Sequence, residues 1–153
     1  MTDLCCNVLR VLEGKTLATA ESCTGGGIGA ALTAVPGSSR VYKGGIISYT
    51  NEVKNALLGV SREVLDREGA VSAPVAEAMA AGARKALGVD VAVSVTGLAG
   101  PDGDDRGNPV GTVYIGYADE NRVCSRKFLF SGSREEIRKA AGEAALYLVL
   151  EVH

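Results

Sequence analysis

The chain contains a single histidine, His153, and it is the last of the 153 residues. A catalytic triad of serine or cysteine with histidine needs that histidine held inside the fold, and so does a histidine-rich metal site. The end of a chain is a poor place for such a residue. The sequence therefore argues against both kinds of site within one chain.

Cysteines in metal-binding or disulfide spacing are also missing. The four cysteines, Cys5, Cys6, Cys23 and Cys124, contain no Cys-x-x-Cys pair. Structural zinc sites and disulfide frameworks usually show such pairs or a secreted context. We expect reduced and mostly buried thiols, and neither a metal nor another cofactor.

Long apolar runs and charge of one sign are absent as well. No apolar run approaches the roughly 18 residues of a transmembrane helix, and the first residues show no basic segment leading into an apolar one. We expect no membrane span, no secretory signal and a cytoplasmic protein. The 16 basic and 18 acidic residues give a net charge of −2, which argues against a nucleic-acid partner because such partners need a basic surface.

Apolar residues and glycine are plentiful. Apolar residues make up 46% of the chain, which is enough for a core, and the length fits one domain of the usual ~100–200 residues, here residues 1–153. Glycine accounts for 20 of the 153 residues, about 13% against an average of about 7%. The glycines cluster without a period, which excludes collagen and indicates tight loops.

Hydrophobic spacing predicts strands and helices in alternation. Helices are expected over residues 3–13, 28–35, 50–58, 61–68, 72–87 and from 134 to the end. Strands are expected over residues 16–21, 41–49, 89–95, 110–118 and 122–130, the last two as a hairpin. This order predicts an α/β fold: a three-layer sandwich with a mixed, mostly parallel sheet, closed by the C-terminal hairpin and helix.

The segment Ser-Cys-Thr-Gly-Gly-Gly at residues 22–27 lies between a strand end and a helix start. Free backbone N–H groups and the positive end of a helix dipole favour anions there. Ser22 fits a nucleophile with glycine N–H groups as oxyanion hole. Phosphate binding fits equally, and so does a structural role in which Ser22 or Thr24 caps the helix. Cys23 is a rival nucleophile, ranked lower because only the helix N-terminus would activate its thiol.

Lys54 is the best candidate for a base. On the wheel of the predicted helix it falls inside the arc formed by Val53, Leu57 and Leu58. Burial lowers the pKa of a lysine and frees a neutral amine. The alternative, more common in general, is a packed stem with the ammonium in water. Since no histidine is available, lysine is the best remaining base if Ser22 is a nucleophile.

Two further side chains follow strand ends. Tyr49 ends the second predicted strand, and Thr96 ends the central strand just before Gly97. Ligands of open α/β sheets bind outside the carboxyl ends of the strands. Ser22, Tyr49 and Thr96 therefore face one crevice if the three strands are parallel neighbours.

Charged residues near this crevice leave alternatives open. The loop over residues 96–109 is long enough to be functional, and its acids are Asp102, Asp104 and Asp105. No glutamate follows them at the distance of a calcium loop, so we favour solvated acids over a metal site. Arg134 and Arg138 either clamp a phosphate or carboxylate or pair with neighbouring glutamates.

Six motifs occur in a fixed order: AESCTGG at 20–26, VPGSS at 35–39, GIISY at 45–49 with Asn51 and Lys54, GAVS at 69–72, VTGLAGP at 95–101 and PVGTV at 109–113. In these motifs the chain resembles the CinA C-terminal domain family over nearly its whole length. The resemblance implies a metal-independent serine amidase. Its implied substrate is a small-molecule nucleotide, nicotinamide mononucleotide, whose carboxamide is hydrolysed to give nicotinic acid mononucleotide and ammonia.

By motif match, the resemblance implies that Ser22 is the nucleophile and Lys54 the base, with Tyr49 and Thr96 beside them. It also implies substrate-binding residues, among which Arg134 contacts the phosphate: Thr24, Gly25, Gly26, Gly97 and Arg134. The alternative is a non-catalytic nucleotide-binding or protein-interaction module, because family membership does not guarantee activity.

The last predicted helix is apolar on most sides. Leu146 and Leu150 lie away from the stripe formed by Ile137 and Leu148. Such a helix is usually buried all round. We therefore expect a homodimer with this helix or its neighbours at the interface, as the resemblance also implies. The alternative is that the N-terminal helix covers the second face within one chain.

Overall fold

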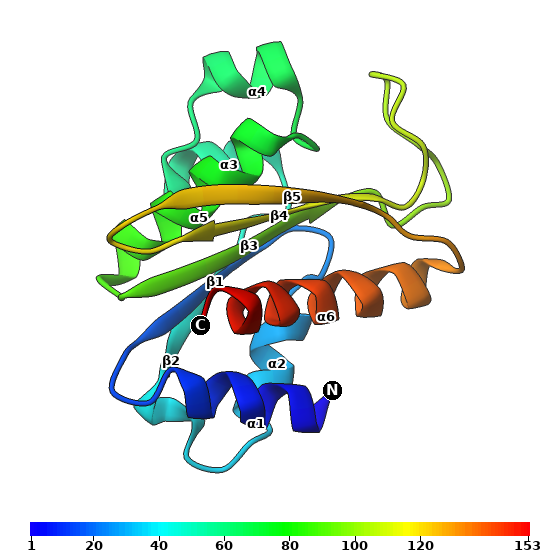
Figure 1. Ribbon diagram of the computed structural model, residues 1–153. Coiled ribbons are helices and arrows are strands. Elements are labelled where there is room, and N and C mark those ends of the chain that lie inside the picture. The colour runs from blue at the N-terminus through cyan, green and yellow to red at the C-terminus, as the bar shows by residue number, and fades with distance from the viewer.

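The computed structural model describes all residues from Met1 to His153. A five-stranded sheet lies between two layers of helices (Figure 1). The strands are β1 (Leu17–Glu21), β2 (Tyr42–Ile47), β3 (Val91–Gly97), β4 (Thr112–Ala118) and β5 (Val123–Leu129). The helices are α1 (Thr2–Val11), α2 (Gly27–Thr33), α3 (Asn51–Leu58), α4 (Arg62–Glu68), α5 (Ala73–Leu87) and α6 (Arg134–Val152), with a 3₁₀ turn at Ser38–Arg40. Every predicted helix and strand is therefore present.

The strand order is β2-β1-β3-β4-β5. β1 pairs in parallel with both β2 and β3, whereas β4 is antiparallel to β3 and to β5. β5 consequently runs in the direction of the first three strands, so the predicted mixed, mostly parallel sheet is confirmed. The sheet is open: the C-terminal hairpin forms one edge and does not close it.

The helices form one layer on each face of the sheet (Figure 1). α1, α2 and α6 pack together on one side, and α5 packs on the other with α3 and α4 against it. The larger hydrophobic cluster lies under α1, α2 and α6, and a smaller one lies under α5. The three-layer prediction is confirmed.

A glycine on α5 fixes how close α3 approaches. A Cβ on Gly82 would overlap the carbonyl of Leu58 at the end of α3. The backbones of the two helices therefore touch, which sets the position of α3 relative to the sheet. This contact matters because α3 carries Lys54.

Helix α1 covers the second apolar face of α6. Leu146 is fully buried, and α1 packs against α6. This is the alternative expected from the sequence, and it explains the apolar character of α6 without a second chain. The homodimer stays a prediction, but burial of the second apolar face of α6 no longer requires it.

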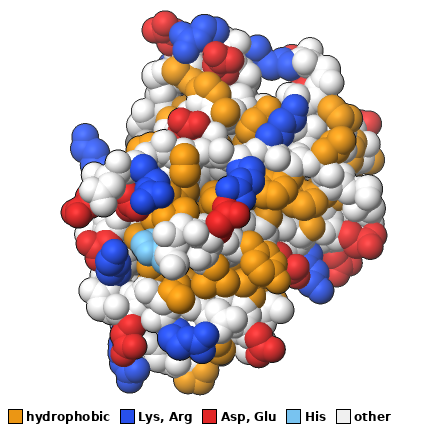
Figure 2. All heavy atoms as spheres, in the orientation of Figure 1, with side chains coloured by type: hydrophobic (Ala, Val, Ile, Leu, Met, Phe, Trp, Pro, Cys, Tyr) orange, Lys and Arg blue, Asp and Glu red, His pale blue; other side chains and the backbone are white.

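The charges on the surface are mixed. On the face drawn in Figure 2, basic and acidic side chains are interspersed with apolar and uncharged ones. None of the helices combines the length and apolar character needed to cross a bilayer.

Candidate active site

A tight turn after β1 places Ser22. Its backbone N–H donates to the carbonyl of Val95 on β3 (3.0 Å), and its own carbonyl accepts from Gly25 N (3.0 Å). Gly25 and Gly26 have φ of 59° and 99°, a left-handed conformation that glycine adopts readily. The chain therefore reverses within three residues of Ser22, whose side chain is largely buried.

Lys54 reaches this turn from the first half of α3. Thr50 caps α3, since its side chain accepts from Val53 N. Lys54 is only 1% exposed, and its Nζ lies 3.0 Å from Ser22 Oγ, 2.8 Å from Ser48 O and 3.3 Å from Tyr49 O. The predicted burial of Lys54 is confirmed, and the contacts of its Nζ are with oxygen atoms of the protein.

The predicted inward arc of α3 was wrong at one position. Leu57 is 57% exposed, whereas Lys54 and Leu58 are buried. The backbone of Leu58 touches Gly82 of α5, and this contact restrains how α3 is turned about its axis. The wheel alone does not contain this constraint.

Burial sets the protonation of both groups beside Ser22. Loss of solvation lowers the pKa of Lys54 from 10.5 to about 8. The same cause raises the pKa of the Cys23 thiol from 9.0 to about 11. A neutral amine is therefore accessible near pH 8, whereas Cys23 stays a thiol, which is the weak form for attack.

A cleft of about 330 Å³ opens at the carboxyl ends of β1, β2 and β3. Such a volume lies within the range of about 300–1,000 Å³ for small-molecule sites. Of the nine predicted catalytic and substrate-binding residues, six line it: Ser22, Tyr49, Lys54, Thr96, Gly97 and Arg134. The expected convergence of these strand ends is therefore present in the fold.

Thr96 and Gly97 have specific environments in this cleft. Thr96 is 1% exposed and its hydroxyl donates to Ala70 O (2.8 Å), so the hydroxyl ties β3 to the turn before α5. A Cβ on Gly97 would lie 2.6 Å from the Val113 side chain, so only glycine fits at that end of β3.

Arg134 and Tyr49 meet at the mouth of the cleft. Arg134 Nη2 donates to Tyr49 Oη (3.1 Å), and its other arm donates to the carbonyl of Gly100. Tyr49 is 57% exposed. Arg138, one turn along α6, instead donates to Cys23 O (2.9 Å) and Thr24 O (3.2 Å). The structure thus separates the two arginines: one lines the cleft and the other braces the turn.

Three predicted substrate-binding residues lie outside this cleft. Thr24, Gly25 and Gly26 are not among the residues that line it. The hydroxyl of Thr24 donates to Glu21 Oε1 (2.7 Å). The N-terminal N–H groups of α2, expected to be free for an anion, donate to the same carboxylate. The anion position of α2 is therefore filled by the protein itself.

Glu21 was not assigned a role from the sequence. It is the last residue of β1 and is 2% exposed. The signal was a carboxylate ending a buried strand directly before a glycine-rich helix start, where negative charge is stabilised.

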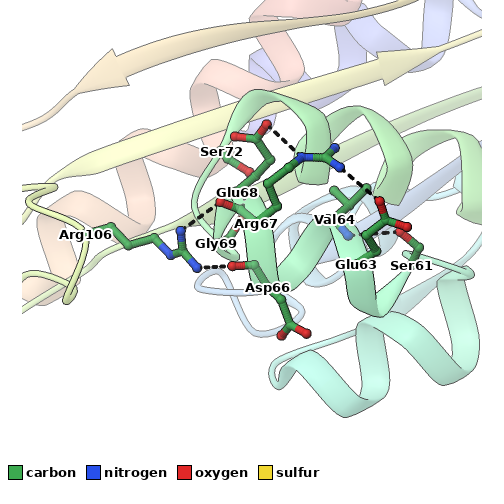
Figure 3. A network of polar contacts seen from close by, with 9 residues as sticks. All are labelled: Ser61, Glu63, Val64, Asp66, Arg67, Glu68, Gly69, Ser72 and Arg106. Carbon is green, nitrogen blue, oxygen red and sulfur yellow. Dashed lines mark hydrogen bonds and ion pairs between the residues drawn. The ribbon is translucent and has the colours of Figure 1, made fainter.

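The long loop after β3 forms one wall of the cleft and is anchored by Arg106. Arg106 Nη1 donates to Arg67 O (2.9 Å), and its other arm donates to Asp66 O at the end of α4 (Figure 3). Asp104 accepts from the backbone of Arg106 and Asn108, so it stabilises the loop internally. Asp102 lines the cleft. No group of three His, Cys, Asp or Glu side chains in the chain is arranged to hold a metal ion.

The family model described as the CinA C-terminal domain matches residues 4–153 of the chain. The CinA-like protein of Thermosynechococcus vestitus is 56% identical over 130 residues, which are 83% of this chain and 31% of that protein. The CinA-like protein of Gemmatimonas aurantiaca is 51% identical over 135 residues, which are 88% of this chain and 32% of that protein. The chain therefore spans about a third of the length of these relatives.

Solved structures share the fold at lower identity. The competence damage-inducible protein A (ComA) of Klebsiella pneumoniae is 34% identical, with a TM-score of 0.96 over 98% of this chain and 94% of that one. The competence/damage inducible protein CihA of Agrobacterium tumefaciens is 38% identical, with a TM-score of 0.94 over 98% and 93%.

Proposed function

This chain belongs to the CinA C-terminal domain family, and from that membership we propose that it is an amidohydrolase using Ser22 as nucleophile and Lys54 as base. The single observation that carries the proposal is the 3.0 Å separation of Lys54 Nζ and Ser22 Oγ, with both side chains buried at a cleft. A nucleophile and its base need hydrogen-bond reach of this kind.

The proposed substrate is nicotinamide mononucleotide, as the motif resemblance implies. A cleft of about 330 Å³ suits a small nucleotide. The carboxamide would lie at Ser22 and the phosphate at Arg134, whose guanidinium stands at the cleft mouth. Arginine is well suited to this contact because its planar fork matches phosphate oxygens.

The contacts of Lys54 orient its lone pair. A neutral amine has two N–H bonds and one lone pair, and two of its three contacts are carbonyl oxygens, Ser48 O and Tyr49 O. The N–H bonds are used there, so the lone pair faces the third contact, Ser22 Oγ. Ser22 then donates its proton to Lys54 as its oxygen attacks the amide carbon.

Transfer of this proton to the leaving group completes the first half of the reaction. The Lys54 ammonium returns it to the departing amide nitrogen, which leaves as ammonia, and an ester joins the acyl group to Ser22. In the second half, Lys54 takes a proton from water, the resulting hydroxide attacks the ester carbon, and Ser22 recovers its proton from Lys54. The products are nicotinic acid mononucleotide and ammonia.

The negative oxygen of the intermediate needs a donor other than α2. The N–H groups of Ile28 and Gly29 are used by Glu21. The backbone N–H of Cys23 makes no hydrogen bond to another residue, and Cys23 lines the cleft. We assign it the oxyanion role, in which one such donor is worth about 10²–10³-fold in rate.

Ammonia release from nicotinamide mononucleotide tests the proposal, with the nucleotide product identified by mass. Ser22→Ala should lose at least about 10³-fold in kcat with the fold retained, because the nucleophile is gone. Cys23→Ala should stay within about tenfold of wild type, because its backbone N–H remains.

The alternative, a non-catalytic binding module, gives a different result in the same assay. Nucleotide binding measured by calorimetry without any ammonia release from the wild type would support the module. Near wild-type turnover by Ser22→Ala would remove the serine mechanism.

A further inference from the structure

The carboxylate of Glu21 is buried and accepts four hydrogen bonds. Oε1 accepts from Thr24 Oγ1 (2.7 Å) and Ile28 N (2.9 Å). Oε2 accepts from Gly29 N (3.0 Å) and Thr19 Oγ1 (3.2 Å). Two backbone N–H groups and two hydroxyls therefore surround the carboxylate, two contacts to each oxygen.

The surroundings leave space for this hydrogen-bond network. Thr19 Oγ1 also lies 2.8 Å from Tyr42 Oη, a contact in which either hydroxyl can donate, so Tyr42 extends the network around Glu21. A Cβ on Gly29 would lie 2.7 Å from Tyr42 Oη, and one on Gly45 would overlap the Thr19 hydroxyl. Two glycines on different elements thus leave the space that this network occupies.

Glu21 is also linked to both proposed catalytic residues. It precedes Ser22 directly, and its own carbonyl accepts from Ser48 N (2.8 Å). Ser48 in turn offers its carbonyl to Lys54 Nζ at 2.8 Å. One residue therefore links the segment that carries the nucleophile to the segment that holds the base.

We propose that Glu21 is the positioning residue of the site: its carboxylate fixes the turn at residues 22–26 to α2 and so keeps Ser22 Oγ on Lys54 Nζ. Burying an ion is costly unless its hydrogen bonds are complete, and the complete set here has the effect of locking the turn. The inference rests on the proposed function, because positioning is defined by the reaction of Ser22.

Replacement of Glu21 by Gln is the direct test. One carboxylate oxygen becomes an NH₂ group that faces a donor at either position, so the turn must shift. Misplacement of a reacting group by about 1 Å costs about 10²-fold in rate, and we expect kcat to fall by about that factor. KM should stay within about threefold of wild type, because Glu21 does not line the cleft.

Thr24 and Thr33 provide a second test with a matched control. Thr24→Val removes one donor to Glu21 and should lower kcat by about tenfold, whereas Thr24→Ser keeps the hydroxyl and should restore it. Thr33 lies on the same helix, is exposed, and donates to Gly29 O (2.8 Å) rather than to Glu21. Thr33→Val makes the same chemical change there and should leave kcat as in wild type.

The outcomes separate this inference from the proposed function. A wild type that neither releases ammonia nor labels at Ser22 with a fluorophosphonate defeats the proposed function. If the wild type is active, equal kcat in Glu21→Gln, Thr24→Val and wild type overturns the positioning role, and so does a loss confined to KM. Should Glu21→Gln fail to fold, the Thr24 pair decides by the same criterion: equal kcat in Val and Ser overturns the inference.

Discussion

Lys54 is the residue whose chemistry depends most on its surroundings. Its pKa lies near 8 because burial disfavours the ammonium, and the proposed base is the neutral amine. We expect kcat/KM for nicotinamide mononucleotide to rise with pH, about tenfold per unit below pH 8, and to level off above it. A pH series from 6 to 9.5 checks this, and a profile that is flat or falls across that range would contradict the role of Lys54.

The same shift predicts how stability depends on pH. The unfolded chain binds a proton at Lys54 up to pH 10.5, whereas the folded chain loses it near pH 8. Between these values the unfolded state holds more protons, so the free energy of unfolding rises with pH, by up to about 1.4 kcal/mol per unit. Below pH 8 both states hold the proton, so Lys54 no longer makes the free energy of unfolding depend on pH.

Lys54→Met has no such proton and serves as the comparison. Urea denaturation of both proteins at pH 7, 8, 9 and 10 gives the difference between their free energies of unfolding. We expect that difference to move in favour of the wild type as the pH rises from 8 to 10. A difference that stays constant with pH would contradict the buried, partly neutral lysine.

Sequence reasoning found the two residues in contact and missed what holds them. The lack of a usable histidine directed attention to Lys54, and the strand-to-helix turn directed it to Ser22. Thr24, Gly25 and Gly26 were expected in the cleft, but the carboxylate of Glu21 fills the anion position of α2. Which of several neighbouring polar groups occupies a helix end depends on side-chain geometry, which the sequence pattern does not contain.

At the scale of elements, hydrophobic spacing and turn residues were sufficient to predict which helices and strands exist and in what order they follow. A capping box begins α6: the Ser133 side chain accepts from Glu136 N, and the Glu136 side chain accepts from Ser133 N. The rotation of α3 about its axis was predicted less accurately: Leu57 is exposed, whereas Leu58 is buried and its backbone touches Gly82 of α5. That contact joins segments distant in sequence, so the wheel of α3 cannot reveal it.

The loop after β3 depends on one side chain for its position. Arg106 ties it to the end of α4 (Figure 3), and a Cβ on Gly69 would lie 2.5 Å from the Arg106 side chain. Arg106→Ala should speed amide exchange over residues 99–109 by about 5- to 30-fold, because each of its two hydrogen bonds to α4 is worth up to about 1 kcal/mol. KM should rise several-fold, since this loop walls the cleft.

Arg62 supplies the control for that experiment. It is exposed on α4 and donates to no acceptor in the protein. Arg62→Ala should leave both exchange and KM at wild-type values. Unchanged loop exchange in Arg106→Ala, measured by mass spectrometry of deuterated peptides, would show that the loop is held by its internal contacts with Asp104.

For the whole molecule, strand order decides where the site lies. β1 sits between β2 and β3, so the loops after all three strands meet around Ser22. An alternation of strands and helices predicts this crevice only if the three strands are neighbours in the sheet. Which strands pair depends on contacts between distant segments, so local sequence patterns do not reveal it. The TM-score of 0.96 to a protein 34% identical is consistent with an architecture that tolerates much substitution.

The homodimer is a prediction at this scale too. The 15.7 kDa chain should scatter light as a particle of twice that mass at micromolar concentration. A mass equal to one chain over a wide concentration range would reject it, and the packing of α1 on α6 would then account fully for the apolar last helix.

The placement of metal-ligating side chains over the whole chain predicts how the activity responds to chelators. No three His, Cys, Asp or Glu side chains converge, and Asp104 is engaged by Asn108 and the backbone. The proposed reaction also assigns each proton transfer to Lys54. We therefore expect EDTA to leave ammonia release unchanged, with a zinc-dependent amidase inactivated in parallel as control. Activity lost to EDTA and restored by a divalent ion would contradict the metal-independent mechanism and direct attention to Asp102 in the cleft.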